Sequence, residues 1–345
     1  MNTNELIERR LARLRVVMAT SKEARALNTE RTYVSHMKQF LWFCAYCPAV
    51  TTAGPEELAR LYVESKARHW SDSSVRSFRN ALVFYYRHVV EKPLGELGPW
   101  AAAKRPKRLP AWLPDGEMRA LLGCMKGVTR LMAELDYGSG LRSHELASLR
   151  WKDLDFTQNQ IIVRQGKGAK DRVTFLPQSC IPALMEQRER MRALWEMDRR
   201  NGRAGVEVPS VKFDGTSWPW FWVWAANGES VDPRTRIVRR HHVHRSTLGK
   251  AIAEAVKIWG GDKRVTVHSL RHSFATEMLM DGMPIHELKE LMGHAHITTT
   301  EIYAHCLPRL TARRGSPMDR VQAVGNVLPF PAGGGEVRLA RASGE

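Results

Sequence analysis

Long apolar runs are missing from this sequence, and so is the kind of leader that directs secretion. No stretch of about 18 consecutive apolar residues occurs in the 345-residue chain, so we expect no membrane-spanning helix. Arg9, Arg10, Arg13 and Arg15 stand near the N-terminus, but no apolar core follows them, which argues against a secretory signal. The sequence therefore favours a protein of the cytoplasm.

Cysteine is also scarce, with five residues scattered along the chain: Cys44, Cys47, Cys124, Cys180 and Cys306. An odd and scattered set in a chain of this length is typical of reduced thiols in a cytosol. Cys44 and Cys47 have the spacing of a zinc or redox pair. They lie in an aromatic helical stretch with no second such pair, so we interpret them as core packing.

Acidic residues are too few to balance the basic ones. The chain has 53 Lys and Arg against 36 Asp and Glu, which gives a net charge of +17. Such an excess predicts a polyanionic partner, either nucleic acid or an anionic membrane surface. Because no membrane segment is expected, nucleic acid is the favoured partner.

The length and a hydrophobic content of 43% predict about two domains with real cores. Residues 1–22 are charged and are predicted to be a basic extension. Residues 23–97 show helical periodicity and predict a small helical bundle. Residues 113–318 form the second domain, mainly helical with a small β-hairpin, so the fold class is α+β. Residues 319–345, rich in Gly, Pro and Ala, are expected to be disordered.

Residues 98–112 between the two domains contain prolines and a run of basic side chains. The basic residues are Lys104, Arg105, Lys107 and Arg108. They either contact phosphates as a basic tether or form a solvated spacer.

A second basic feature is a predicted hairpin tip. Two predicted strands, residues 160–165 and 172–176, flank the sequence GKGAKD, which is typical of a β-turn region. Lys167 and Lys170 both lie in this turn and can reach a ligand. Lys170 is interpreted as a phosphate contact or a solvent-exposed side chain.

The strongest chemical pattern lies near the C-terminal end of the second domain. His268 and Arg271 are three residues apart in a helical pattern and therefore share one helix face. His294 follows a glycine, and Tyr303 stands nine residues later. Arg binds phosphate bidentately, His moves protons near neutral pH, and Tyr can form a covalent intermediate. Each residue alone would be structural, but together they predict phosphoryl transfer.

This pattern, H-x-x-R then G-H then Tyr, resembles the tyrosine recombinase (phage integrase) family. Residues 140–146, GLRSHEL, resemble that family's G-[LM]-R-x-x-E-L motif. The resemblance implies that Arg142 is a second phosphate-binding arginine, that Glu145 supports it, and that Lys167 is the hairpin lysine. It also implies an N-terminal SAM-like core-binding domain that closes with the catalytic domain into a C-shaped clamp around DNA.

The resemblance further implies a mechanism. Tyr303 would attack a DNA phosphorus and form a 3′-phosphotyrosine bond, while the two arginines and His294 hold the phosphate oxygens. His268 would assist removal of the phenolic proton, and Lys167 would protonate the departing 5′ oxygen. No metal and no cofactor is expected, because the arginines neutralise the charge. Strand exchange between two duplexes implies a homotetramer.

Residues 201–245 contain an unusual insertion. Four tryptophans alternate over residues 218–224, and a basic, histidine-rich run follows over residues 239–244. Alternation in a strand would place the indoles on one face, either as a buried aromatic layer or as a surface that stacks on unpaired bases. A metal site at His241 and His244 is not favoured, because no carboxylate or cysteine stands at ligand spacing.

The insertion is similar to that of the integron integrases, on the sequences W-P-W-x-x-V-W-A, D-P-R-T and R-R-H-H. This resemblance implies that Trp220 and Pro233 form a base-stacking pocket, with His241 and His242 as its paired histidines. It implies DNA substrates of two kinds, a duplex site and a folded single-stranded hairpin with extrahelical bases. The expected setting is the bacterial cytoplasm, in association with the nucleoid.

Three alternatives stay open. The insertion could be purely structural in a phage- or Xer-type integrase that acts on duplex DNA. The chain could reseal its own strand, as a type IB topoisomerase does. It could also be a DNA-binding protein without activity, although every expected catalytic position is filled.

Overall fold

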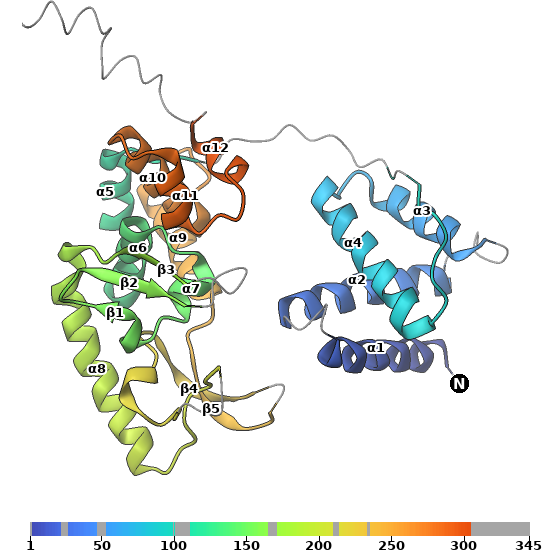
Figure 1. Cartoon of the computed structure of the whole chain (residues 1–345), viewed down its shortest axis with the longest axis horizontal. Coiled ribbons are helices and arrows are strands. Elements are labelled where there is room, and N and C mark those ends of the chain that lie inside the picture. The colour runs from blue at the N-terminus through green and yellow to red at the C-terminus, as the bar shows by residue number, and fades with distance from the viewer. Residues whose placement is uncertain are drawn as a thin grey trace, which may run out of the picture. The chain divides into compact units, whose positions relative to one another are not determined.

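The computed structural model describes residues 2–21, 27–46, 53–98, 100, 111–164, 171–209, 214–232 and 235–304. It divides into two compact units, Met1–Arg108 and Leu109–Glu345, which we describe separately. Both are built mainly from helices, and the second also holds two small antiparallel sheets (Figure 1). The predicted α+β class is confirmed.

The first unit is a helical bundle. Its elements are α1 (Thr3–Thr20), α2 (Leu27–Tyr46), α3 (Pro55–Lys66), α4 (Asp72–Tyr85) and a π-helical turn, η2 (Tyr86–Val90). A capping box begins α1. The Asn2 side chain accepts a hydrogen bond from the backbone N–H of Asn4, and the Glu5 side chain accepts one from the backbone N–H of Asn2. Phe40 packs edge to face on Tyr62 and Phe78 in the core of the bundle, and the rings of Tyr62 and Phe78 are tilted against each other.

The predicted boundary at residue 22 is corrected by this packing. Ile7, Leu11, Leu14 and Met18 of α1 are buried in the same core as α2 and α4. Their spacing places them on one face of the helix, while the arginines of α1 occupy other faces. The charged residues 1–22 therefore supply the first helix of the bundle. The net charge of the segment concealed its apolar stripe.

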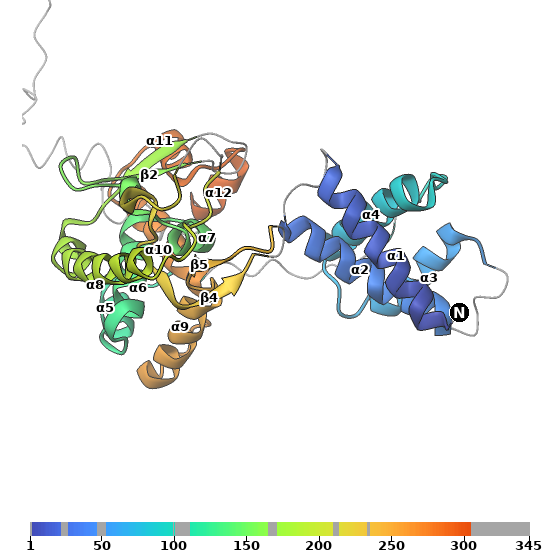
Figure 2. The ribbon, with the colours of Figure 1, turned by 90° about the horizontal axis from the view of Figure 1, so that it is seen from below.

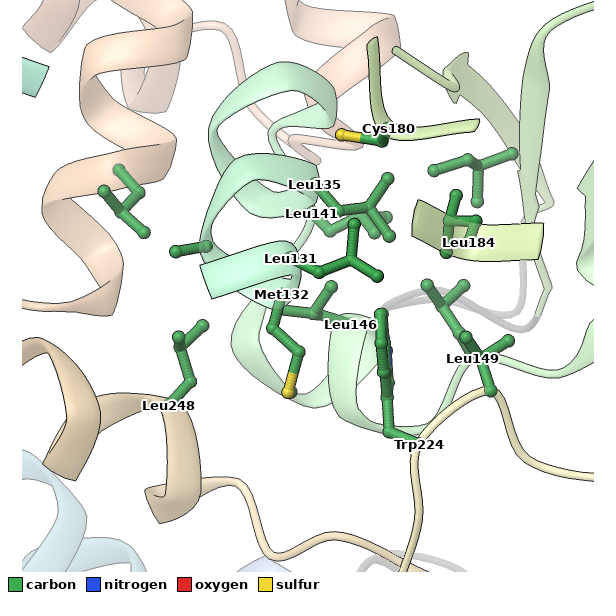
Figure 3. Close-up of a cluster of buried hydrophobic side chains, with 14 of the residues drawn as sticks. Leu131, Met132, Leu135, Leu141, Leu146, Leu149, Cys180, Leu184, Trp224 and Leu248 are labelled. Atoms are coloured by element: carbon green, nitrogen blue, oxygen red, sulfur yellow. The ribbon is translucent and has the colours of Figure 1, made fainter. Parts of the chain in front are cut away.

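The second unit contains eight helices in the part of the chain that is described. They are α5 (Asp115–Gly123), α6 (Gly127–Ser139), α7 (Ser143–Ala147), α8 (Ile181–Arg200), α9 (Ser246–Trp259), α10 (Val267–Met280), α11 (Ile285–Met292) and α12 (Thr298–Ala304). Short 3-10 turns cover Trp151–Asp153 (η3), Gln178–Cys180 (η4) and Trp218–Trp220 (η5). A core of leucines around α6 holds these elements together (Figure 3).

The two sheets of this unit are small. The first has the order β1 (Leu154–Asp155), β2 (Gln160–Val163), β3 (Arg172–Phe175), with Ile161 opposite Thr174. The second pairs β4 (Ala225–Val231) with β5 (Val238–His242). The strands β2 and β3 match the two strands predicted on either side of GKGAKD. The predicted tip, with Lys167 and Lys170, lies outside the described residues.

The candidate chemistry and the insertion occupy different places in this unit. Helices α10, α11 and α12 lie together at one end, and the β4–β5 hairpin lies at the other (Figure 1). The view from below shows α11 and α12 together as well (Figure 2). The strand β3 packs against α11, which connects the small sheet to the first group.

Candidate active site

The C-terminal ends of two helices lie at the candidate site. Helix α6 ends at Gly140 with φ 61°, and α11 ends at Gly293 with φ 63°, both in the left-handed region that favours glycine. A Cβ at Gly140 would also collide with the ring of Phe274, and a Cβ at Gly293 would press on the Arg172 side chain. Both glycines therefore allow α10 and β3 to approach closely.

Arg142 lies at the start of α7, immediately after the α6 end. Its guanidinium donates to the carbonyl of Gly293 and, at 2.8 Å, to Glu145 Oε1. Its backbone N–H donates to Glu145 Oε2, also at 2.8 Å. The Arg142 side chain is 19% exposed, so it is not completely enclosed by these partners.

Glu145 is a buried anion that binds two arginine side chains of the site. Besides Arg142, it accepts hydrogen bonds of 2.9 and 2.6 Å from the guanidinium of Arg172. Burial alone would raise the pKa of Glu145, but the bonds and charges of Arg172 and Arg142 lower it to about 2. It is therefore a carboxylate at neutral pH, and it fixes both guanidinium groups.

Arg271 on α10 is buried and connects the two helix ends. It donates to the carbonyl of Gly140, to the carbonyl of Met292 at 2.6 Å, and meets His294 Nε2 at 3.1 Å. Burial and the neighbouring Arg142 lower its pKa to about 10, which still leaves the guanidinium charged at neutral pH. The site therefore holds three guanidinium groups in fixed positions, those of Arg142, Arg172 and Arg271.

His294 lies between Arg271 and Thr300. Arginine can only donate, so Nε2 is the acceptor and Nδ1 carries the proton that is donated to Thr300 Oγ1 at 2.9 Å. Burial and Arg271 lower the pKa of His294 to about 4. The imidazole is thus neutral at pH 7, with both nitrogens engaged.

Tyr303 on α12 is 2% exposed and contacts two imidazole rings. The His294 ring is stacked on it with centroids 6.1 Å apart, and the His272 ring is tilted with centroids 5.2 Å apart. His268 is exposed, and its ring lies 6.4 Å from that of His272. The structure therefore assembles Arg142, Glu145, Arg271, His294 and Tyr303.

Sequence reasoning missed Arg172 and His272. The sequence pattern marks Arg172 only as the first residue of a strand, and His272 directly follows Arg271 without belonging to the H-x-x-R spacing. A signal did exist for His272, because His268 and His272 are four residues apart and share a helix face. Lys167 lies outside the described residues.

The tryptophans of the insertion do not form the alternating strand that we expected. Residues 218–220 form a 3-10 turn that Pro219 suits, because proline has no N–H to contribute to a strand. The chain then runs along residues 149–151: Trp151 N–H donates to Phe221 at 3.2 Å, and Val223 N–H donates to Leu149 at 2.9 Å. The four indoles therefore do not share one face of a strand.

Three of the four indoles are packing groups. Trp224 is 1% exposed and lies beside Leu146 and Leu149 (Figure 3). Trp222 is also buried, and its Nε1 donates to the carbonyl of Arg240 at 3.2 Å. Trp218 is partly buried and stacks on Trp151 with ring centroids 5.6 Å apart.

Trp220 has a different environment. It lines a cavity of about 640 Å³ between the insertion and the small sheet, together with Trp222, His242, Arg150 and Lys152. The Lys152 ammonium lies 3.8 Å from the centre of the Trp220 ring, and Arg150 lies 3.7 Å from that of Trp222. The cavity thus combines aromatic faces with cations.

The predicted partners of Trp220 are only partly brought together. His242 lines the cavity, its ring meets Trp222 edge-on at 5.0 Å, and burial lowers its pKa, so it is neutral at pH 7. His241 precedes it on β5 and, by strand alternation, points to the opposite face. Pro233 and the basic residues Lys104, Arg105, Lys107 and Arg108 lie outside the described residues.

The basic run on β5 also contains a structural residue. Arg240 is 2% exposed and binds Asp198 of α8 through two bonds of 2.6 and 2.7 Å. It also donates to the carbonyls of Ala226 and Asn227. Arg240 therefore fastens the hairpin to α8 and is not available to a ligand.

Within the described ranges, no group of three or more His, Cys, Asp or Glu side chains is arranged to hold a metal ion. No helix in the described part of the chain is long and apolar enough to cross a membrane. Arg271 interacts electrostatically with Tyr303, and its guanidinium and that of Arg142 suit an anionic substrate such as a phosphate.

The chain is similar in sequence to known proteins along most of its length. The sequence model of the phage integrase family matches residues 111–309, and that of the phage integrase N-terminal SAM-like domain matches residues 13–96. An integrase/recombinase of Escherichia coli is 41% identical over 299 residues, which cover 85% of this chain and 89% of the relative. Tyrosine recombinase XerA of Thermococcus onnurineus is 31% identical over 289 residues, covering 81% and 86%.

Two solved structures share the fold. The XerH site-specific recombinase bound to a palindromic difH substrate has a TM-score of 0.55 at 19% identity, covering 90% of this chain and 85% of that one. A lambda integrase dimer bound to a core site has a TM-score of 0.58 at 16% identity, covering 86% and 94%.

Proposed function

Because this chain belongs to the phage integrase family, and is thus a tyrosine site-specific recombinase, we propose that Tyr303 is its DNA-cleaving nucleophile. The observation that carries the proposal is the convergence of Arg142, Arg271 and His294 beside Tyr303. These groups come from segments that are distant in sequence, and the His294 ring, which contacts Arg271, stacks on the Tyr303 ring.

The proposed roles follow from charge and position. The Tyr303 hydroxyl attacks a backbone phosphate of DNA, which yields a 3′-phosphotyrosine and a free 5′-hydroxyl. Arg142 and Arg271 neutralise the phosphate oxygens, and Glu145 holds Arg142 in place for this task. His294 donates a hydrogen bond to a phosphate oxygen in one of two ways. Its ring turns so that Nδ1–H leaves Thr300, or its Nε2 takes up a proton beside the anionic phosphate. The family resemblance assigns protonation of the 5′ oxygen to Lys167.

The covalent bond conserves the phosphoester, so a second 5′-hydroxyl can attack it and rejoin the strands. Exchange between two duplexes requires four such cleavages, which supports a tetrameric assembly on DNA. The net charge of +17 supports strong, salt-dependent binding to the DNA backbone.

A covalent-trapping experiment tests this function. The chain and its Tyr303→Phe variant are incubated with labelled duplexes that carry a nick near the cleavage position, across a library of candidate sites. An adduct that survives denaturation with the unchanged chain and not with the variant is the expected result. An adduct of equal yield with Tyr303→Phe would contradict the assignment.

The finer proposal is that the chain is an integron integrase that inserts and excises gene cassettes. The support is the cavity beside Trp220, which offers an aromatic face, a neutral imidazole from His242 and two flanking cations. An unpaired base that protrudes from a folded single strand needs such a combination, since bases stack on aromatic rings while phosphates attract cations.

Trp220→Ala tests this binding mode. We expect it to weaken binding to a hairpin with protruding bases by about 1–3 kcal/mol per lost stack, and to leave duplex binding nearly unchanged. Trp220→Phe is the matched control, because it keeps an aromatic face. Equal losses on hairpin and duplex would favour a structural insertion in an integrase that acts on duplex DNA only.

A further inference from the structure

Arg150, one of the two cations beside Trp220, is already engaged by the protein itself. It donates to the carbonyl of Trp220 at 2.8 Å and to the carbonyl of Glu207 at 2.6 Å, and its guanidinium lies over the ring of Trp222. Its distance to the centre of the Trp220 ring is longer, at 5.2 Å. Arg150 therefore fixes the main chain at Trp220 and contributes less to the orientation of that indole.

Lys152 is the cation that lies directly over the Trp220 ring. Its ammonium is 3.8 Å from the ring centre, which is well within the range of a cation–π interaction. The Asp153 carboxylate lies 3.7 Å from the same ammonium, and the Lys152 side chain is 19% exposed. Burial lowers the pKa of Lys152, while the charge of Asp153 acts in the opposite direction and favours the cation. The ammonium thus has an aromatic ring and a carboxylate as its partners.

Asp153 is held in place by neighbours on both of its oxygens. Its Oδ2 accepts a hydrogen bond from the backbone N–H of Arg150 at 3.2 Å, and its Oδ1 accepts one from Arg164 Nε at 3.1 Å. The Asp153 side chain is only 10% exposed. Because Asp153 would break these bonds by moving, it keeps the Lys152 ammonium close to the indole. A series of contacts therefore connects Arg164, Asp153 and Lys152 with Trp220.

The orientation of Trp220 matters more than that of its neighbours. Trp222 and Trp224 are buried, so packing fixes their rings, whereas Trp220 is partly exposed at the cavity. A side chain that is ordered before its ligand arrives binds more tightly, because the entropy of ordering it is not lost on binding. Lys152 provides such ordering on one face of the ring. A base that stacks on Trp220 has to use the opposite face.

We propose that Lys152 is a positioning residue for Trp220, whose ammonium fixes one face of the indole so that the other face receives an unpaired base of a folded DNA strand. This inference rests on the proposed role of the cavity in hairpin recognition. It gives Lys152 an effect on hairpins alone and no contact with the DNA backbone. A backbone contact would act on every DNA, since a hairpin and a duplex carry the same phosphates.

The test compares binding of the full chain to two labelled DNAs, a hairpin with protruding bases and a duplex whose bases are all paired. Lys152→Met keeps a flexible side chain of similar length without the charge, whereas Lys152→Arg keeps a cation that stacks on aromatic rings. We expect Lys152→Met to weaken hairpin binding about 3- to 10-fold, as the loss of a cation–π contact predicts, and to leave duplex binding unchanged. Lys152→Arg should retain most of the hairpin affinity.

Two further measurements separate positioning from a phosphate contact. In a Trp220→Ala background, Lys152→Met should cause no further loss of hairpin binding, because the ring that Lys152 positions is gone. The salt dependence of duplex binding should keep its slope in Lys152→Met, since no phosphate contact is lost. The matched control is Lys257→Met on α9, whose side chain is 71% exposed, and it should bind both DNAs as the unchanged chain does.

Each outcome leads to a different conclusion. If Trp220→Ala weakened hairpin binding and Lys152→Met did not, the inference would be overturned and the proposed role of the cavity would stand. Equal losses on hairpin and duplex would also overturn it, whether they came with a smaller salt slope, as for a phosphate contact, or from loss of folding. Additive losses in the double variant, or a loss that Lys152→Arg fails to restore, would do the same. If neither Trp220→Ala nor Lys152→Met affected hairpin binding, the inference and the hairpin proposal would both be wrong.

Discussion

Replacing Glu145 by glutamine should destabilise the second unit strongly, although the two side chains have almost the same shape. The Glu145 carboxylate is 7% exposed and accepts one backbone and three side-chain hydrogen bonds from Arg142 and Arg172. A glutamine amide would offer one oxygen and would turn N–H groups toward a guanidinium. Two cations would then remain close together, with Arg271 nearby, and without their anion.

Two independent arguments give the magnitude. Burial by itself raises the pKa of Glu145, yet Arg172 and Arg142 lower it from its ordinary 4.5 to about 2. This difference corresponds to about 3 kcal/mol at 1.36 kcal/mol for each pH unit. Removing one partner of a buried ion pair typically costs about 3–5 kcal/mol. We therefore expect Glu145→Gln to lower the free energy of unfolding by about 3 kcal/mol at pH 7.

Urea unfolding of the full chain, followed by tryptophan fluorescence, measures this effect. Because the folded-state pKa lies below the unfolded value, the contribution is complete above about pH 5 and is lost as the pH falls toward 2. The difference between the unchanged chain and the variant should thus shrink on acidification. The control is Glu134→Gln, whose partner Arg130 is an exposed neighbour on α6, and it should change stability by about 0.5 kcal/mol or less.

A loss below about 1 kcal/mol at pH 7 would refute this reasoning, because it would mean that water, and not Arg142 and Arg172, solvates the carboxylate. A loss that stays constant down to pH 3 would also refute it, since the electrostatic part must titrate away.

Three further substitutions test other parts of the unit. Asp136→Leu on α6 should raise the free energy of unfolding by about 1 kcal/mol or more, and with it the thermal unfolding midpoint. The reason is that the Asp136 carboxyl is fully buried and that neither of its oxygens has a hydrogen-bond partner among the described residues. Burial raises the pKa of Asp136, so lowering the pH should stabilise the unchanged chain relative to this variant. A lower midpoint for Asp136→Leu at neutral pH would contradict the interpretation. Asp198→Ala should lower the free energy of unfolding, measured in urea, by about 3–5 kcal/mol, because it leaves the buried Arg240 without its anion. A loss under about 1 kcal/mol would mean that the carbonyls of Ala226 and Asn227 alone satisfy the Arg240 guanidinium. Trp224→Ala should lower the free energy of unfolding by about 3–5 kcal/mol in the same assay, because Trp224 is buried. If Trp220→Ala lowered it as much or more, the two indoles would not differ in burial as described.

Much of the fold was predictable because it depends on neighbours in sequence. The apolar period of 3.6 residues indicated the helices of the first unit, and the glycine-bearing segment between two short strands indicated β2 and β3. The same approach failed for α1 and for residues 218–224. In α1 the abundant charge obscured the stripe of Ile7, Leu11, Leu14 and Met18. In the tryptophan segment, alternation was present, but Pro219 and the contacts with residues 149–151 overrode the strand geometry.

The sequence by itself determined the residue types and their spacing along each helix: His268 and Arg271 share a face of α10 because helix geometry places residues three apart side by side. Only the tertiary structure decided which partners they meet. Arg271 contacts the end of α6, which is 131 residues away in sequence, and Glu145 is held by Arg172 across 27 residues. Likewise, the packing of α12 on α10 brings the ring of His272 to 5.2 Å from that of Tyr303. The fold of the insertion buries Trp222 and Trp224 and leaves Trp220 partly exposed at the cavity. The spacing of residues along one helix follows from backbone geometry. Contacts between distant segments depend on how the faces of helices and strands pack on one another, and the periodicity of the sequence does not specify that packing.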